Sequence, residues 1–236
     1  MFARILIAAV FAGAASGVVA ALLQFMFVHP VLMAAEAFEL GAVDDQNGPV
    51  VLTVQLLGDL AGFDMMRTAL NVLFQMLTYT GFAMILVAGM AQAERVGHVT
   101  TPLTGLLWGL AGFITVQLAP GLGLPPDVPG VSTADIGARQ LWWGITVGCT
   151  GLALWLIAFA RAHMVWVLAI ALLLAPHFVG APPPPRYSDL VPPELAALFV
   201  ARSLGVGLAG WAILGGLAAY FWRREDKCAT IGNNRT

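Results

Sequence analysis

The sequence predicts an all-α integral membrane protein with about six transmembrane helices, arranged as three hairpins with Pro-rich outer loops. Of its 236 residues, 59% are hydrophobic and only 10% are charged, and its mean hydropathy is +0.85. Soluble globular domains carry about 25% charged residues. The few charges are clustered and leave six apolar windows, each close to the roughly 20 residues that cross about 30 Å of hydrocarbon. We therefore expect a chain that crosses a membrane several times.

The six windows define the expected spans in chain order. The third and fifth are short, and we expect Pro120 and Pro176 to end them, because proline lacks the N–H that continues a helix. The expected spans are 5–28, 68–91, 103–119, 141–160, 164–181 and 200–222.

The first window has a second interpretation, as a secretory signal. Arg4 precedes the apolar run, and AGAAS resembles a small-residue cleavage site. The apolar run from Ile5 to Val28 is longer than the about 7 to 15 residues of a signal core. We therefore expect this segment to remain as a helix.

Each odd-numbered span leaves the membrane through a proline, in VHP at 28–30, LAP at 118–120 and LAP at 174–176. Proline after a helix fixes an extended exit, so these outer loops should be stiff. Each loop returns the chain into the following span, which gives the three hairpins.

The domain organisation is simple. The longest loop, 29–66, is too short to bury a core of its own. We expect one polytopic membrane domain over 1–225 and a short cytoplasmic tail over 226–236.

Lys and Arg indicate the orientation in the membrane. With six spans the two termini share a side, and that side holds seven of the 11 basic residues, namely Arg4, Arg95, Arg161, Arg223, Arg224, Lys227 and Arg235. The other side holds Arg67, Arg139, Arg186 and Arg202 together with ten of the 13 acids. This bias predicts that both termini lie in the cytoplasm. An acidic outer face would attract cations, although ordinary hydrophilic loops would give the same count.

Small residues at four-residue spacing predict close packing between spans. These stripes contain Gly13 and Gly17 in the first span, Gly105 and Gly109 in the third, and Gly144 and Gly148 in the fourth.

Polar side chains are scarce within the spans. They include Gln24 in the first span, Asn71, Gln75 and Thr78 on one face of the second, and Thr115 and Gln117 in the third. Hydrogen bonds between helices explain them. The alternative is that Gln24, Asn71 and Gln75 form a neutral, weakly coordinating path for an ion.

The segment FVHPVLMAAEAFE, residues 27–39, contains the best candidate for a metal site. Pro30 suits the first position of an amphipathic helix, on which Glu36 and Glu39 would be neighbours. His29 precedes this helix, and His177 stands at the corresponding exit of the fifth span. Imidazole with carboxylate suits Co(II), Ni(II), Zn(II) or Fe(II). Residues that only anchor the chain at the membrane interface would look the same.

Motifs for enzymatic chemistry are absent from the sequence. Lys227 is the single lysine and lies outside any Gly-rich loop, and no nucleophile elbow, metalloprotease helix or dinucleotide fingerprint occurs. We therefore expect no enzyme, no resident cofactor and no nucleic-acid partner. Glu94 and His98, on the cytoplasmic side, are interpreted as exposed helix-end residues, with an exit pair of ligands as the alternative.

Four segments carry a resemblance to a known family. They are GFDMMRTALNVLF at 62–74, GLLWGLAGFITVQLAPGLGLPPDVPGVSTADIGARQLWW at 105–143, APHFVGAP at 175–182 and VPPELAALFVARSL at 191–204. Together with the first span and AEAFE, they resemble the CbtA family of probable cobalt transporter subunits over nearly the whole chain. The matching positions are Glu36, Glu39, Asp127, Asp135, Arg139, Gln140, Trp142, Trp143 and His177.

The resemblance implies a bacterial inner-membrane protein that takes up cobalt for cobalamin supply, with cobalt as the transported ion. It also implies a small single-span partner with a His-rich end, CbtB, besides membrane lipids; homo-oligomerisation stays open. Trp142 and Trp143 are interpreted as an aromatic belt at the outer interface. Arg139 would extend to the interface or pair with Asp135, four residues earlier.

The sequence supports one transport hypothesis and two alternatives. In the hypothesis, cobalt is captured by His29, Glu36, Glu39 and His177 and passes along the amides of the first two spans. In the first alternative, the chain is a membrane scaffold or assembly partner that transports nothing. In the second, it is a permease for nickel or another divalent cation, because ligand type selects only a class of metals.

Overall fold

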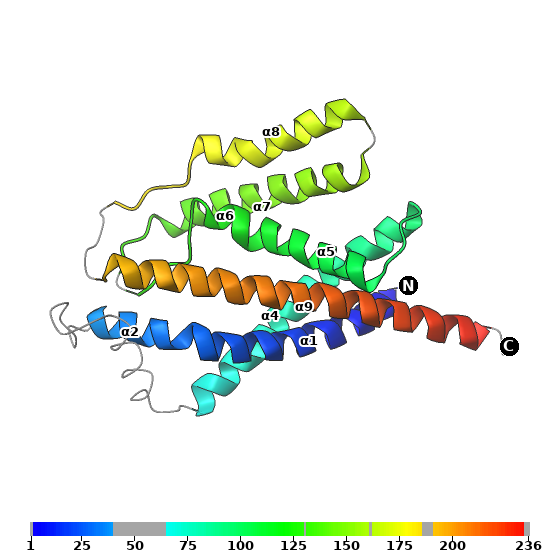
Figure 1. Ribbon diagram of the computed structural model, residues 1–236, viewed down its shortest axis with the longest axis horizontal. Coiled ribbons are helices and arrows are strands. Elements are labelled where there is room, and N and C mark those ends of the chain that lie inside the picture. The colour runs from blue at the N-terminus through cyan, green and yellow to red at the C-terminus, as the bar shows by residue number, and fades with distance from the viewer. Residues whose placement is uncertain (1, 40–64, 130, 161, 186–190, 234–236) are drawn as a thin grey trace. The chain divides into compact units, whose positions relative to one another are not determined.

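The computed structural model describes residues 2–39, 65–129, 131–160, 162–185 and 191–233, and the side chains of these residues apart from Glu39 and 225–233. Within these ranges the chain forms helices and no strand, which confirms the all-α class (Figure 1). The elements are α1 (Phe2–Phe27), α2 (His29–Glu39), α4 (Met65–Arg95), α5 (Pro102–Phe113), the π-helix η1 (Ile114–Leu118), α6 (Ala119–Gly121), α7 (Ile136–Phe159), α8 (His163–Val179) and α9 (Pro193–Asn233).

The described helices account for the predicted spans. Five apolar segments are long enough to cross a membrane: Phe2–Phe27, Met65–Arg95, Pro102–Gly121, Ile136–Phe159 and Pro193–Arg224. The sixth, α8, has 17 residues and is about 25 Å long, close to the lower limit for a span. The chain is a multi-pass membrane protein with about six transmembrane helices.

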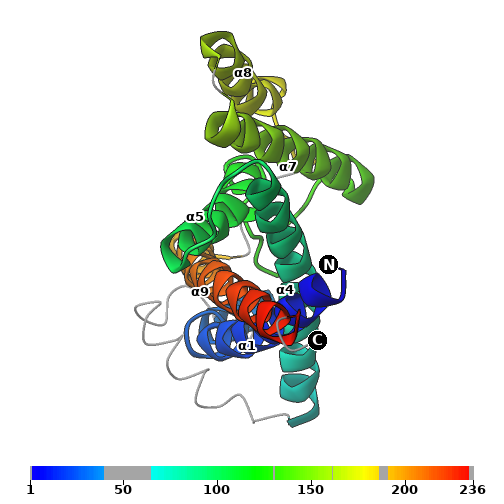
Figure 2. The ribbon, with the colours of Figure 1, turned by 90° about the vertical axis from the view of Figure 1, so that its right-hand side faces the viewer.

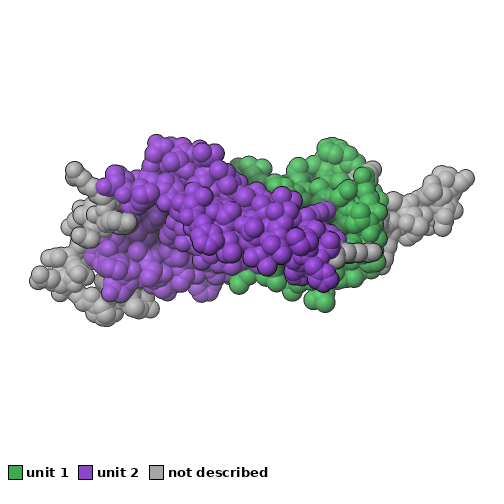
Figure 3. Space-filling view, turned by 90° about the horizontal axis from the view of Figure 1, so that it is seen from above, with its two compact units in different colours: residues 1–24, 63–112, 206–236 green, residues 25–62, 113–205 purple. Residues whose placement is uncertain are grey.

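The helices belong to two compact units, which Figure 3 shows in different colours. Unit 1 comprises residues 1–24, 63–112 and 206–236, and unit 2 comprises 25–62 and 113–205. The long helices α1 and α9 each contribute to both units.

Local sequence signals set several helix ends. Thr101 and Thr104 cap the start of α5 reciprocally: the Thr101 hydroxyl accepts from the Thr104 N–H at 3.1 Å, and the Thr104 hydroxyl accepts from the Thr101 N–H at 2.7 Å. Gly97, with φ +92°, follows the end of α4, and Gly180, with φ +82°, follows α8. Only glycine adopts this left-handed backbone without strain, so both helices end there.

The expectation that Pro120 and Pro176 end their helices was wrong. Pro120 lies inside α6, and α8 continues past Pro176 to Val179. A proline ring conflicts with the carbonyl four residues earlier, which for Pro120 is Val116 in η1. The wider turn of the π-helix relieves that conflict and lets the helix continue to Gly121.

Helix α9 extends well beyond the apolar window 200–222. It begins at Pro193, which suits the first position of a helix, with Glu194 in the first turn. It ends at Asn233, after the polar residues RREDK. Hydropathy identifies only the apolar part of a helix, whereas the helical backbone continues here through polar residues on both sides of that part.

Unit 1 is held together by close backbone contacts at small residues. A Cβ added to Gly17 of α1 would lie 2.5 Å from the Met76 Cα of α4, and one added to Gly105 of α5 would lie 2.6 Å from the Gly215 carbonyl oxygen of α9. Gly13 and Gly109 make similar contacts, which confirms the first two predicted stripes.

The stripe in the fourth span does not form such an interface. A Cβ on Gly144 or Gly148 of α7 would meet no atom within 4 Å, so packing at these two glycines was predicted wrongly. The buried face of α7 instead carries Trp142, Thr146, Thr150 and Ala153. In unit 2, α7 packs against α8, which lies beside it in Figures 1 and 2.

Candidate functional site

Two of the predicted metal ligands lie on α2, in unit 2. His29 begins this helix, and its ring stacks on Phe25 with the centroids 5.4 Å apart. Glu36 follows two helical turns later, on the same face and about 10.5 Å further along the axis. Glu39 ends α2, but its side chain lies outside the described part of the structure.

Helix α2 itself forms as the sequence suggests. Val31, Ala34, Ala35 and Phe38 are buried at the i, i+3, i+4, i+7 spacing of an apolar helix face, whereas Glu36 is partly exposed. Arg202 of α9 donates from Nη1 to the Phe27 carbonyl oxygen at 3.0 Å, in the last turn of α1. A basic side chain on the last carbonyls of a helix is a common way to satisfy them.

His177 lies in the last turn of α8 and packs edge-on against Trp142 of α7, with the ring centroids 5.9 Å apart. The Trp142 indole N–H donates to the Pro176 carbonyl oxygen at 3.2 Å. Trp142 therefore connects α7 to α8. Because Trp142 is buried, the prediction that it belongs to an aromatic belt at the interface was wrong. Its neighbour Trp143 is 43% exposed and suits that role.

No group of three or more His, Cys, Asp or Glu side chains within the described residues is close enough to hold a metal ion. His29, Glu36 and His177 all belong to unit 2, but they do not make such a group there. The set that includes Glu39 stays a prediction.

The predicted ion-path residues lie in unit 1. Gln75 of α4 donates a side-chain hydrogen bond from Nε2 to Oε1 of Gln24 on α1. Asn71, one turn before Gln75, is exposed. Gln24 and Gln75 are therefore joined by a hydrogen bond between helices. This was one of the two interpretations of these amides, the other being an ion path.

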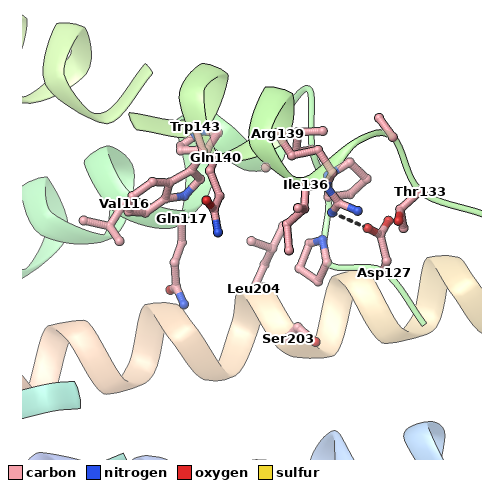
Figure 4. A pocket seen from close by; sticks show the side chains of 16 residues that line it. Val116, Gln117, Asp127, Thr133, Ile136, Arg139, Gln140, Trp143, Ser203 and Leu204 are labelled. Carbon is pink, nitrogen blue, oxygen red and sulfur yellow. Dashed lines mark hydrogen bonds and ion pairs between the residues drawn. The ribbon is translucent and has the colours of Figure 1, made fainter. Parts of the chain in front are cut away.

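Unit 2 contains a pocket of about 530 Å³ beside η1 (Figure 4). Its wall comes from η1 and α6, the Pro-rich segment after them, the start of α7 and the first part of α9. The polar side chains that line it are Gln117, Asp127, Thr133, Arg139, Gln140 and Ser203.

An ion pair lies in the wall of this pocket. The Arg139 guanidinium donates from Nη2 to Oδ2 of Asp127 at 2.5 Å, and the two side chains are 26% and 30% exposed. The predicted alternative partner, Asp135, accepts from the Ala138 N–H at 3.0 Å and caps α7. The pairing of Arg139 with Asp135 was therefore wrong, because an N-cap carboxylate already has a backbone donor in reach.

Gln117 supplies an unsatisfied group in the pocket wall. Its Oε1 is buried and has no hydrogen-bond partner in the described part of the chain. A buried carbonyl-type oxygen without a donor is costly and usually has a functional explanation or a bound water. Gln117 lies on the π-helix, a feature found frequently at functional sites.

The sequence contained only partial signals for this pocket. Gln117 is polar within a span, and Pro120 three residues later conflicts with regular helix. Neither signal shows that the Pro-rich segment folds back beside Gln117. Chemically, the pocket offers one carboxylate and several neutral oxygens, which suit a hydrated hard cation better than a tightly ligated metal.

A comparison with protein-family models decides the identity of the chain. A model described as "Probable cobalt transporter subunit (CbtA)" matches residues 2–223. The chain belongs to the CbtA family. No curated protein and no solved structure matched the chain in the other two comparisons.

Membership of the CbtA family agrees with the architecture described above. The match covers α1 through most of α9, which confirms the resemblance noted from the sequence. A CbtA protein is a subunit of a probable cobalt transporter, so it works with at least one other component. Four of the positions that carried the resemblance line the pocket of unit 2: Asp127, Arg139, Gln140 and Trp143.

Proposed function

We propose that this CbtA family member is the large membrane subunit of a cobalt uptake system and that it captures Co²⁺ on the acidic side of the membrane. The observation that supports this most directly is the match to the family of probable cobalt transporter subunits over residues 2–223. Three of the predicted capture residues, His29, Glu36 and His177, belong to one compact unit, but among the described residues they do not form a three-ligand group. These are imidazole and carboxylate groups, the types of ligand that bind divalent first-row metals.

In this proposal the ion first meets His29, Glu36, Glu39 and His177. It loses part of its water there and then passes the neutral amides of Gln24, Asn71 and Gln75. Neutral amides hold an ion weakly enough to release it, which conduction requires. A doubly charged ion is costly within hydrocarbon, so the path is hydrated or is shared with the partner.

The partner is CbtB, a small single-span protein with a His-rich end, and the system supplies cobalt for cobalamin. The chain lies in the bacterial inner membrane with both termini in the cytoplasm. The sequence has no P-loop, so any ATP hydrolysis would need another subunit. A membrane-impermeant maleimide tests the orientation in a Cys149→Ser background: Cys228 should react in lysed cells and stay protected in intact ones.

Uptake of radioactive cobalt and nickel tests the proposed function. Cells would express the chain with and without CbtB, as wild type or as the Glu36→Ala/Glu39→Ala double variant. We expect cobalt uptake in the wild type and its loss in the double variant at equal amounts of protein in the membrane. The matched control is Asp135→Asn/Glu194→Gln, which also removes two exposed carboxylates and should leave uptake intact.

Each other result has a distinct meaning. If cells with the wild-type chain and CbtB took up no more cobalt than empty cells, the chain would not be a transporter and the scaffold alternative would hold. Faster uptake of nickel than of cobalt would keep the permease and change its cargo. If the double variant and its control lost cobalt uptake equally, the negative charge of the surface would promote uptake, and ligation of cobalt at α2 would not be needed to explain the loss.

A further inference from the structure

We propose that the pocket beside η1 is a binding site for a hydrated divalent cation. In this proposal Arg139 forms an ion pair with Asp127 until the cation displaces the arginine. This inference rests on the proposed function, because cobalt is the ion that the chain would carry. It assigns the pocket a role separate from the capture residues on α2 and α8.

The size of the pocket fits an ion that keeps its water. Six waters take up about 180 Å³ at roughly 30 Å³ each, and the pocket measures about 530 Å³. A bare ion would touch only one wall, whereas a hydrated one can reach donors on several elements.

The lining supplies the donors that such an ion needs. Oxygen atoms come from the Asp127 carboxylate, the amides of Gln117 and Gln140 and the hydroxyls of Thr133 and Ser203. Figure 4 shows Gln140 directed into the space between α7 and α9, with Gln117 beside it. Mg²⁺, an octahedral divalent ion that dehydrates reluctantly, keeps several waters in proteins and is bound through one or two carboxylates, and we propose the same mode of binding here.

Gln117 also lines the pocket, and its Oε1 is buried without a hydrogen-bond partner in the described part of the chain. A buried oxygen is out of reach of a water in the pocket, so the Gln117 side chain would have to turn before Oε1 could accept from a water polarised by a divalent cation. Such a turn would give the unsatisfied oxygen the donor that it lacks, which favours it.

Arg139 is the partner of Asp127 when no ion is present. The two side chains form a direct ion pair, yet both are about a quarter exposed or more. Partly exposed pairs are weak because water screens them. A divalent cation carries twice the charge of a guanidinium and can compete for the carboxylate. Arg139 lies in the first turn of α7, from which its long side chain can turn to water.

Binding of Co²⁺ to the purified full-length protein, measured by isothermal titration, tests this competition. The Glu36→Ala/Glu39→Ala variant serves as background, so that binding at α2 does not obscure the pocket. In this background Asp127→Asn should abolish the remaining binding. Arg139→Gln should tighten Co²⁺ binding by about two- to fivefold, because the cation no longer has to break a partly exposed ion pair of that strength. Gln117→Leu should weaken Co²⁺ binding.

The matched control is Asp135→Asn, which removes one carboxylate from the same segment and keeps an N-cap group. It should bind Co²⁺ like its parent. If Arg139→Gln binds no more tightly than its parent, or Asp127→Asn binds equally well, the pocket is a closed structural ion pair and the inference fails. Should Asp127→Asn misfold on size-exclusion chromatography, the gain of affinity in Arg139→Gln still decides.

Failure of the pocket and failure of the proposed function are distinguishable. Uptake that depends on Glu36 and Glu39, combined with pocket variants that bind Co²⁺ like their parent, would remove the pocket site and leave transport in place. Pocket binding that follows Asp127 and Arg139, without uptake in cells, would remove transport and leave a cation-binding subunit.

Discussion

The indole Nε1–H of Trp222 donates a hydrogen bond to Oε2 of Glu94 at 3.0 Å and so joins the end of α4 to α9 within unit 1. Trp222 is only 2% exposed, and the Arg4 guanidinium lies over its ring, 4.7 Å from the centroid. Glu94 thus has a structural partner on another helix, which favours a structural role for it over the predicted alternative of an exit ligand with His98.

Trp222→Phe should lower the free energy of unfolding by about 1–2 kcal/mol, because the half-buried Glu94 loses a donor while the apolar packing is largely kept. Thermal unfolding in detergent measures the change. Trp166→Phe is the control, since Trp166 is 47% exposed on α8 and should change little. Equal shifts for the two variants would mean that the hydrogen bond to Glu94 does not stabilise unit 1.

Gly17→Ala should destabilise the protein, whereas Gly144→Ala should not. A Cβ at Gly17 would lie 2.5 Å from the Met76 Cα, and backbone atoms cannot move aside as the end of a flexible side chain can. Overpacking of this kind costs about 1–3 kcal/mol. At Gly144 the added methyl meets nothing within 4 Å and favours the helix. Unfolding temperatures of the two variants, compared with wild type, give the answer, and a shift at Gly144 alone would contradict it.

Gln24 and Gln75 should be energetically coupled. A double-mutant cycle with Gln24→Leu and Gln75→Leu should give a coupling of about 0.6 kcal/mol and at most about 1.7 kcal/mol, as for other hydrogen bonds between membrane helices. The same variants measured for cobalt uptake separate the two interpretations of these amides. Coupling with unchanged uptake makes the pair structural, and lost uptake in correctly folded single variants places it on the ion path.

Much of the fold could be predicted because hydropathy and small-residue spacing report on local physics. Within the described residues the apolar windows located five candidate spans and the shorter apolar helix α8, and Gly17 marked a true contact between α1 and α4. Gly144 carried the same signal and was misleading, because spacing shows that a close approach is possible and does not show which helix arrives. The predicted helix ends at Pro120 and Pro176 were also wrong. A widened π-helical turn can accommodate a proline within a helix, and a glycine that follows the proline can set the helix end instead.

The pocket could not be predicted for a related reason. Asp127 and Arg139 are 12 residues apart, and the segment VPGVSTADIGA separates them. Sequence spacing suggested Asp135 for Arg139, because side chains four residues apart on a helix are neighbours. In the structure Asp135 accepts a hydrogen bond from the backbone at the start of α7, and Arg139 forms its ion pair with Asp127. Such a choice depends on how the loop folds back, which no local pattern encodes.

Asp135 offers a direct test of that division of roles. Its carboxylate caps α7 by accepting from the Ala138 N–H, so Asp135→Ala should cost about 0.5–2 kcal/mol, whereas Asp135→Asn should cost little because asparagine caps equally well. Chemical or thermal unfolding of both variants in detergent measures the difference. If Asp135→Asn were as destabilising as Asp135→Ala, the negative charge itself would matter, and Asp135 would then be acting on Arg139 as well as on the helix end. The unequal result leaves Asp127 as the carboxylate that Arg139 holds, which is the condition for a cation to displace that arginine from the pocket.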